Sequence, residues 1–251
     1  MGDVYFDSRA GRFQENIYNS PKGQLRLMLL HDDLQQFLDT ETSLDVLDAG
    51  GGLGQMSLLF AEAGHRVTYC EPAQNLFEQA RATFSAAQLD DRIELINAPV
   101  QTLFGKGRSF DLILCHAVLE WLEQPQQVLS QMSGLLRADG HLSLMFFNVH
   151  SIILRNLLRG NFRKAISGDF RGDPGSMTPL NPLEPEMVLL WLRENGMHIE
   201  LETGIRSFSD YLSREHRERT GIQELYDLER RFARQEPYLR MARYIHVLAR
   251  K

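Results

Sequence analysis

Hydrophobic positions change their spacing along the chain, and each change marks a different kind of element. Between residues 20 and 40, apolar side chains recur with a period near 3.6, at Leu25, Met28, Leu29, Leu34, Phe37 and Leu38. This period predicts an amphipathic helix. Ser20 and Pro21 stand just before it, where an N-terminal cap and a first-turn proline favour helix initiation.

From residue 44 onward, short apolar runs alternate with segments of helix length. The runs cover residues 44–47, 67–70, 93–96, 110–115 and 142–147. Strands separated by helices are typical of parallel βαβ units. After residue 148 we expect a helix over 150–165, a glycine- and proline-rich loop or lid over 167–185, and a helix from about 185 to 195 closed by Gly196. Two further strands, 198–205 and 244–249, are expected with helices between them.

These elements predict one α/β domain over residues 1–251. We expect a Rossmann-like, seven-stranded, mostly parallel sheet with helices on both faces. Residues 1–43 would form an N-terminal helical lid, 44–148 the βαβ core that binds a cofactor, and 149–251 the substrate-side helices and last two strands. The composition, 43% apolar and 24% charged, is that of an ordinary globular protein.

The charge is distributed unevenly. The net charge is −6, but residues 151–251 carry 17 basic and 14 acidic side chains, and 23 of the 27 basic residues are arginine. The planar guanidinium suits phosphate and carboxylate groups, so this part of the chain could bind an anion; solvated, ion-paired helices are the alternative. We see no membrane segment and no secretory leader, and expect a cytoplasmic protein. The two separated cysteines give no reason to expect a metal site.

A glycine-rich turn follows the first predicted strand. Asp48 ends the strand, and glycines follow at positions 50, 51, 52 and 54. Glycines allow tight turns and close approach of a ligand. A dinucleotide site would show Gly-x-Gly-x-x-Gly instead, and an acidic strand end suits a ligand with an ammonium group better than a pyrophosphate. The alternative is a purely structural turn.

Polar residues also stand at the ends of the next strands. Glu71 lies about 20 residues beyond the glycines, where a carboxylate can accept hydrogen bonds from both ribose hydroxyls. Val100 and Gln101 follow the third strand and could contact an adenine, or could simply begin a helix. His116 ends the fourth strand and should face the ligand crevice, although many single histidines are structural.

Beyond the glycine turn, several strings resemble the family of bacterial tRNA 5-carboxymethoxyuridine methyltransferases. They are residues 22–26 (KGQLR), 116–121 (HAVLEW), 142–146 (LSLMF), 160–162 (GNF), 234–238 (RQEPY) and 243–247 (RYIHV). The resemblance implies a class I fold with S-adenosyl-L-methionine as donor, S-adenosyl-L-homocysteine as product and no metal. The implied reaction is methyl esterification of 5-carboxymethoxyuridine at the tRNA wobble position, giving 5-methoxycarbonylmethoxyuridine.

The resemblance also implies which residues contact the cofactor and the partner. Cofactor positions carried over from the family, together with the glycine motif, are Arg26, Asp48, Gly50, Gly51, Gly52, Glu71, Val100, Gln101 and His116. Arg26 would bind the methionine carboxylate as a two-pronged donor. The expected partner is the tRNA anticodon stem-loop, with no DNA and no membrane. Aspartate is frequent in this family where the chain has Glu71, and either acid can bind ribose.

The acceptor side is predicted to position its substrate without acid–base catalysis. A carboxylate nucleophile is already unprotonated near neutral pH, so we expect no catalytic residue in the strict sense. Arg206 and Arg243 are candidates to hold the acceptor carboxylate, and Arg155, Arg159, Arg163 and Lys164 recur on one predicted helix that could meet phosphates. Two other functions stay open: methyl transfer to a small metabolite, and a non-catalytic, cofactor-binding RNA-binding module.

Overall fold

The computed structural model describes residues 3–4, 20–172, 179 and 181–251. Its centre is a seven-stranded sheet with the order β3-β2-β1-β4-β5-β7-β6. Strand β7 is antiparallel to both neighbours, and the other pairs are parallel. The strands are β1 (Asp45–Ala49), β2 (Arg66–Cys70), β3 (Ile93–Ile96), β4 (Phe110–His116), β5 (Leu136–Phe147), β6 (His198–Ile205) and β7 (Tyr244–Arg250). The predicted seven-stranded, mostly parallel, Rossmann-like fold is confirmed.

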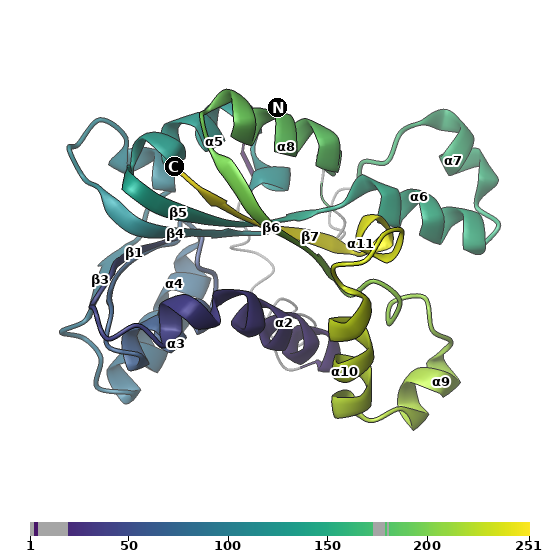
Figure 1. The fold of residues 1–251 in the computed structure, drawn as a ribbon, viewed down its shortest axis with the longest axis horizontal. Coiled ribbons are helices and arrows are strands. Elements are labelled where there is room, and N and C mark those ends of the chain that lie inside the picture. The colour runs from purple at the N-terminus through teal and green to yellow at the C-terminus, as the bar shows by residue number, and fades with distance from the viewer. Residues whose placement is uncertain (1–2, 5–19, 173–178, 180) are drawn as a thin grey trace.

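Helices cover both faces of the sheet, as expected. Figure 1 shows α2, α3 and α4 on one face and α5 and α8 on the other. The helices are α2 (Pro21–Leu38), α3 (Gln55–Glu62), α4 (Gln74–Ala86), α5 (Pro125–Gly134), α6 (Val149–Leu158), α7 (Phe162–Ser167), α8 (Pro185–Glu194), α9 (Arg214–Arg219), α10 (Ile222–Phe232) and α11 (Tyr238–Met241), with short 3₁₀ turns η3 (Val100–Leu103) and η4 (Leu119–Trp121). None of the described helices is long and apolar enough to cross a membrane.

The central strands are apolar on both faces because both faces are covered. Successive side chains of a strand point to opposite faces. In β4, Leu112 and Leu114 join the cluster that contains Phe60 of α3 and Phe84 of α4. Ile113 of the same strand joins the cluster formed with α5 and α8. This double burial explains why the strands read as continuous apolar runs.

Two predicted elements differ from the observed ones. Strand β5 begins at Leu136, six residues before the predicted start. Its first half is polar, and its register against β4 shifts there, with Asp139 at a φ of +61°; this irregularity hides the strand from a search for apolar runs. The helix predicted over 150–165 is two helices, α6 and α7, separated at Gly160, whose φ is +72°.

The N-terminal helix and the long loop fall where the sequence predicts them. The Ser20 side chain accepts a hydrogen bond from the Gly23 N–H and caps α2, and Pro21 stands in the first turn. Of the lid predicted over 1–43, residues 1–2 and 5–19 lie outside the described residues, as do 173–178 and 180 of the loop predicted over 167–185. Helix α7 takes the first residue of that predicted loop and α8 its last, and the described residues between them contain no helix. Helix α8 ends at Glu194, just before Gly196 with a φ of +73°.

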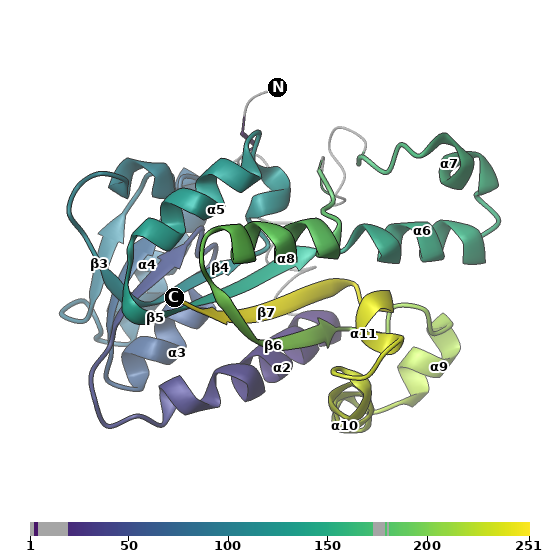
Figure 2. The same ribbon diagram turned by 45° about the horizontal axis from the view of Figure 1, so that its top comes forward.

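Helices α6 and α7 form an arm that extends beyond the end of the sheet, as Figure 2 shows from a second direction. We call residues 149–167 the α6–α7 arm. Its exposed apolar side chains are Leu157, Leu158, Phe162 and Ile166. In contrast to these exposed side chains, both cysteines are completely buried, Cys70 in β2 and Cys115 in β4.

Candidate active site

A pocket opens at the carboxyl ends of the parallel strands, where ligands bind in open α/β sheets. All nine residues predicted to contact the cofactor line it: Arg26, Asp48, Gly50, Gly51, Gly52, Glu71, Val100, Gln101 and His116. Helix α2 supplies one wall through Arg26, Leu27 and Leu30. Sequence motifs from five separate segments therefore meet at one cavity, although their individual contacts with a cofactor stay predictions.

The glycine turn has the close approach that its composition predicts. Gly50 and Gly52 have φ values of +74° and +57°, which glycine adopts without steric cost. A Cβ added at Gly51 would lie 2.6 Å from the Tyr69 ring and 2.7 Å from the Asp48 carboxylate. The turn is therefore compact enough for its backbone to form the floor of the pocket.

Asp48 is a buried acid at the pocket wall. It is 3% exposed, and its Oδ2 accepts a hydrogen bond of 2.7 Å from the Ser57 hydroxyl. Burial raises the pKa of Asp48 to about 6, against the smaller opposing effect of Ser57. A cation that entered the pocket beside Asp48 would favour its ionised form.

Glu71 joins the first two strands across the pocket floor. Its two oxygens accept hydrogen bonds from the Gly52 N–H at 2.9 Å and from the Ala73 N–H at 2.8 Å. A carboxylate has about four acceptor positions, so a pair of ribose hydroxyls is within its capacity. Glu71 thus fixes the glycine turn and faces the pocket with the same group.

The predicted adenine side includes a contact that the sequence did not indicate. The Gln101 side-chain amide donates to Asp3 Oδ2 at 3.0 Å, and the other oxygen of Asp3 accepts from the Glu123 N–H at 2.8 Å. The next residue, Val4, lines the pocket. Residues 3–4 therefore close the wall beside Val100 and Gln101, a long-range contact with no signal in the sequence.

His116 enters the pocket as a neutral imidazole. Burial, followed by the charge of Arg26, holds its pKa well below the usual range. Its Nε2 lies 2.8 Å from the Ser143 hydroxyl. Among the described residues, its Nδ1 has no hydrogen-bond partner.

Arg206 and Arg243 lie together beside the pocket and not in its lining. Arg206 stacks over the Tyr244 ring at 5.6 Å, and Arg243 over the Phe147 ring at 4.5 Å; both rings line the pocket. Neither arginine is among the residues that line the pocket, and their contact with an acceptor carboxylate stays a prediction.

Asp210 joins these arginines into a cationic cluster. It forms ion pairs with Arg206, with Arg243 at 3.6 Å and with Lys22 at 3.2 Å. Burial alone would raise the pKa of Asp210, but the charges of the three cations hold it well below its usual range. We call Lys22, Arg206, Asp210 and Arg243 the Asp210 cluster; with three cations and one anion it carries a net positive charge.

Glu120 is a pocket residue that the sequence analysis did not single out. It lines the pocket and is 1% exposed. Its Oε1 accepts from the Phe147 N–H at 3.1 Å, whereas Oε2 has no partner within the described part of the chain. Burial raises its pKa to about 8. An acid inside the otherwise apolar string of residues 117–122 is the signal that could have identified it.

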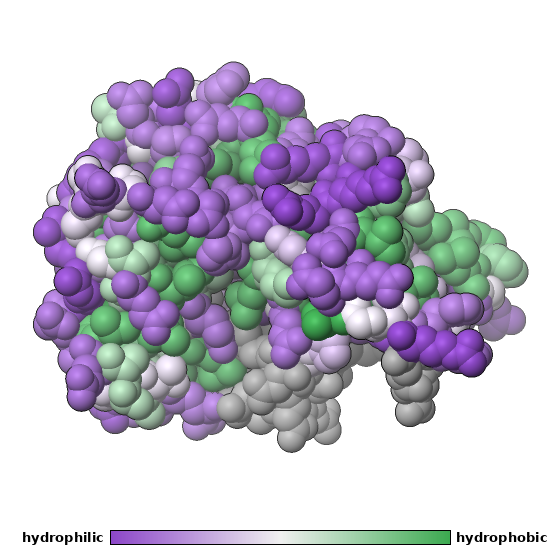
Figure 3. Space-filling model, turned by 60° about the horizontal axis from the view of Figure 1, so that its bottom comes forward, coloured by the Kyte–Doolittle hydropathy of each residue, from purple (hydrophilic) through white to green (hydrophobic). Residues whose placement is uncertain are grey.

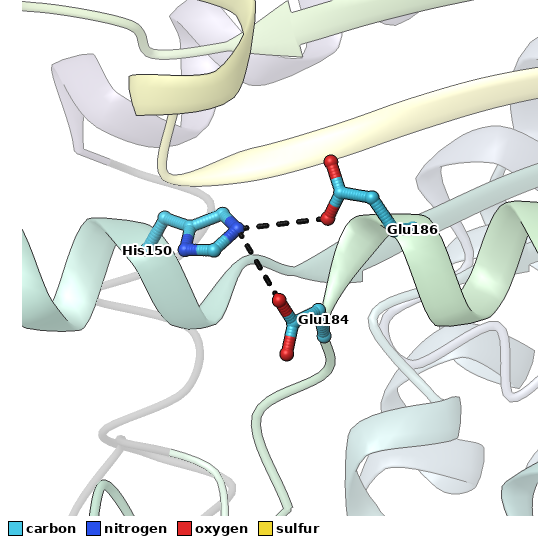
Figure 4. Close-up of side chains that lie close together, drawn as sticks. All are labelled: His150, Glu184 and Glu186. Carbon is cyan, nitrogen blue, oxygen red and sulfur yellow. Dashed lines mark ion pairs between the residues drawn. The ribbon is translucent and has the colours of Figure 1, made fainter. Parts of the chain in front are cut away.

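A separate group of polar side chains lies at the base of the α6–α7 arm (Figure 4). His150 Nε2 is 3.9 Å from a Glu184 oxygen and 3.6 Å from a Glu186 oxygen. The three side chains offer ligand atoms of the kinds that metals bind. None of the three lines the pocket. Their visible role is to join α6 to the start of α8.

Comparison with known proteins shows that the sequence is similar to methyltransferases. Residues 47–144 match a family model described as a methyltransferase domain. The chain is 41% identical over 254 residues to the tRNA 5-carboxymethoxyuridine methyltransferase of Escherichia coli, covering all of this chain and 97% of that protein. It is 31% identical over 167 residues to the ubiquinone biosynthesis O-methyltransferase of Xylella fastidiosa, covering 64% of this chain and 63% of the other.

Solved structures show the same fold. The magnesium protoporphyrin IX methyltransferase of Synechocystis, with bound S-adenosylhomocysteine, superimposes with a TM-score of 0.63 at 16% identity, over 98% of this chain and 96% of that one. At this identity the similarity supports the fold alone.

Proposed function

The chain belongs to the family of tRNA 5-carboxymethoxyuridine methyltransferases, and from this premise we propose how its residues perform that reaction. It is an S-adenosyl-L-methionine-dependent methyltransferase. We propose that it esterifies the carboxylate of 5-carboxymethoxyuridine in the tRNA anticodon loop, in the cytoplasm, as one domain. The observation that carries the proposal is the single pocket lined by all nine predicted cofactor residues, with a cationic cluster at its side.

The pocket residues fit this cofactor by charge and shape. Glycines leave the floor open to a close ligand, Glu71 suits the ribose hydroxyls, and Arg26 suits the methionine carboxylate. Asp48 suits an ammonium group. When bound, the cofactor supplies a methyl group on a sulfonium, which makes the methyl carbon electrophilic.

The remaining task of the chain is to bring a carboxylate into line with that methyl group. Because a carboxylate is ionised near neutral pH, no side chain has to remove a proton. Alignment and exclusion of water then account for the catalysis. Enzymes that act on a base first take it out of the base stack and into a pocket. Phe147 and Tyr244 line the pocket and would form the apolar walls around this flipped-out base.

The Asp210 cluster would attract the acceptor. Its net positive charge lies behind Phe147 and Tyr244, so its field reaches the pocket while its side chains stay ion-paired. A cation behind an aromatic wall favours an anion in front of it without forming a bond that would reduce its reactivity. Arg206 and Arg243 are thus proposed as field and positioning residues, not as the bidentate clamp that the sequence predicted.

The α6–α7 arm would bind the stem-loop. It carries Arg155, Arg159, Arg163 and Lys164 together with exposed apolar side chains. Figure 3 shows a hydrophobic area at the end of the molecule that the arm occupies in Figure 1. Cations beside apolar and aromatic groups suit phosphates next to unstacked bases. A small metabolite would need neither, which favours RNA over the small-molecule alternative.

The test compares three acceptors with the purified protein and S-adenosylmethionine. They are an anticodon stem-loop with 5-carboxymethoxyuridine, the same loop with unmodified uridine, and the free nucleoside. Mass spectrometry of the digested nucleosides should find the methyl ester with the first acceptor alone. Equal methylation of the free nucleoside would support a small-molecule acceptor, and cofactor binding without any transfer would support the non-catalytic module.

Matched arginine variants test the cationic cluster. Arg243→Met should lower kcat/KM for the stem-loop about tenfold, with little change in cofactor affinity. Arg66→Met is the control, because Arg66 pairs with Asp45 at the opposite end of the strands and is exposed. Equal activities of the two variants would contradict a role for the cluster.

A further inference from the structure

A chain of buried hydrogen bonds runs from α2 to the pocket. Asp33 Oδ2 lies 2.6 Å from His246 Nδ1, and His246 Nε2 lies 2.8 Å from the Ser143 hydroxyl. The same hydroxyl lies 2.8 Å from His116 Nε2. The remaining ring nitrogen, His116 Nδ1, has no partner among the described residues and belongs to a side chain that lines the pocket.

The members of this chain are shielded from water and come from four elements. Asp33 lies in α2, Ser143 in β5, His246 in β7 and His116 at the end of β4. Asp33 is 6% exposed, and Ser143 and His246 are completely buried. A buried polar network of this kind is costly unless each member is satisfied. Every link is satisfied except the last atom, His116 Nδ1, which is buried and belongs to a side chain that lines the pocket.

With Asp33 ionised and His116 neutral, two proton arrangements satisfy the three contacts. In the first, His246 is neutral: its Nδ1–H donates to Asp33 and its Nε2 accepts from the Ser143 hydroxyl. The Ser143 oxygen then accepts from His116 Nε2–H, and His116 Nδ1 carries a lone pair. In the second, His246 is an imidazolium that donates to Ser143, the hydroxyl donates to His116 Nε2, and His116 Nδ1 carries the proton.

The surroundings favour the first arrangement. Arg234 donates to the other oxygen of Asp33 at 2.8 Å, so the carboxylate has a counter-charge without a charged histidine. A completely buried imidazolium would add a desolvation cost. Arg26 also lines the pocket, and a lone pair is the better neighbour for a guanidinium than a second N–H group.

We infer that Asp33, His246 and Ser143 are positioning residues that fix the tautomer of His116, so that its Nδ1 presents a lone pair to the pocket. A lone pair there accepts a hydrogen bond and therefore suits the ammonium group of the cofactor, beside the Arg26 that suits its carboxylate. This role rests on the proposed assignment of His116 to the cofactor site. It makes His116 a recognition group for the amino acid end and not a proton carrier.

The tautomer is directly measurable in the wild-type protein. With ¹⁵N-labelled histidine, long-range ¹⁵N–¹H correlation spectra separate a protonated ring nitrogen from one with a lone pair. We expect the His116 signals to show a proton on Nε2 and none on Nδ1, unchanged from about pH 6 to about pH 8. A proton on Nδ1, or a charged ring, would overturn the inference without reference to any variant.

A binding comparison tests the consequence. S-adenosylhomocysteine contains the ammonium group, whereas 5′-methylthioadenosine lacks the whole amino acid end. Ser143→Ala should raise the Kd of S-adenosylhomocysteine about three- to tenfold, as for one lost hydrogen bond, and leave that of methylthioadenosine within about twofold. Its His116 spectrum should shift toward a mixture of the two tautomers.

Ser133→Ala is the matched control, since the Ser133 hydroxyl donates to the Ser130 carbonyl within α5, away from the pocket. This control variant should leave the Kd of both ligands unchanged. If Ser143→Ala weakened the binding of both ligands equally, Ser143 would have a merely structural role. If it changed neither Kd, Ser143 would have no role in binding. Either result overturns this inference but leaves the cofactor assignment standing. If the wild-type protein failed to bind S-adenosylhomocysteine, the cofactor assignment itself would be overturned.

Discussion

The buried acid at the end of β1 should make cofactor binding depend on pH. Asp48 has a pKa of about 6 in the protein without ligand because it is buried. An ammonium group beside it would favour the carboxylate and return its pKa to about 4, the ordinary value for aspartate. Binding then requires the ionised form, so affinity should fall as the pH falls through 6.

The magnitude follows from the two pKa values. At about pH 8 Asp48 is ionised with or without ligand, and at about pH 5 roughly nine-tenths of the free protein is protonated. The Kd for S-adenosylhomocysteine should therefore rise about tenfold between these pH values, or about 1.4 kcal/mol. Close to one proton should be released per ligand bound at the lower pH.

Isothermal titration calorimetry measures both quantities. Titrations from about pH 5 to pH 8, in two buffers of different ionisation enthalpy, give the Kd and the number of protons released. Asp48→Asn should abolish the pH dependence, whereas Asp111→Asn should keep it, because Asp111 pairs with Arg137 at the opposite end of β4. A wild-type Kd that is constant across this range, with no proton release, would refute the reasoning.

The same substitution should stabilise the protein without its cofactor. An acid whose pKa is higher in the folded than in the unfolded state loses stability as the pH rises from its ordinary value to the folded one. For Asp48 the difference corresponds to about 3 kcal/mol above pH 6. Asp48→Asn should therefore unfold at a higher temperature than the wild type at pH 8, and at about the same temperature near pH 4.

Four more predictions concern the turn, the pocket and the partner. Glu71→Ala should weaken S-adenosylhomocysteine binding by about 1.5–3 kcal/mol in calorimetry, and should also lower the stability of the turn, because the Gly52 and Ala73 N–H groups lose their acceptor; an unchanged Kd would remove Glu71 from the site. Gly54→Ala should lower the free energy of unfolding, measured in urea, by about 2–4 kcal/mol, because its φ is +79° and an added Cβ would clash with the Phe84 ring. The control Gly64→Ala has a similar backbone strain, with a φ of +98°, but no atom within 4 Å, so it should lower the free energy of unfolding less. Equal losses in the two variants would show that the clash has no effect. Glu120→Gln should stabilise the fold by about 5 kcal/mol at pH 9 but not at pH 4, since burial raises the pKa of Glu120 to about 8; a gain independent of pH would contradict this cause. Filter binding should show the logarithm of tRNA affinity falling against that of salt concentration with a slope of about −3, for four arm cations; a flat dependence would favour a small-molecule acceptor.

The sequence predicted the fold well because each element needed only local information. The runs that became β1, β2 and β4 are buried along most of their length, and the glycine turn has a conformation that few other residues adopt. Ser20 and Gly196 likewise marked helix ends through their own backbone chemistry. Strand β5 was found only in part, since its first half is polar and shifted in register.

The features that the sequence did not indicate depend on packing between distant segments. Asp33 and His246 are 213 residues apart and meet only because α2 crosses the sheet beside β7. Arg206 and Arg243 lie over Tyr244 and Phe147, two rings that line the pocket, and nothing in the spacing of the arginines indicates this placement. From the sequence alone, Glu120 would be expected at the surface, but in the structure it is buried in η4.

The buried thiols have a practical consequence for labelling the protein. Burial raises the pKa of Cys70 to about 12, and it raises that of Cys115 further. Since only a thiolate reacts with maleimides and iodoacetamides, the native chain should stay unmodified under ordinary conditions. Ile166, 84% exposed on the arm, is then a suitable position for one introduced cysteine. A fluorophore attached there would report the arrival of a tRNA without any prior removal of native cysteines.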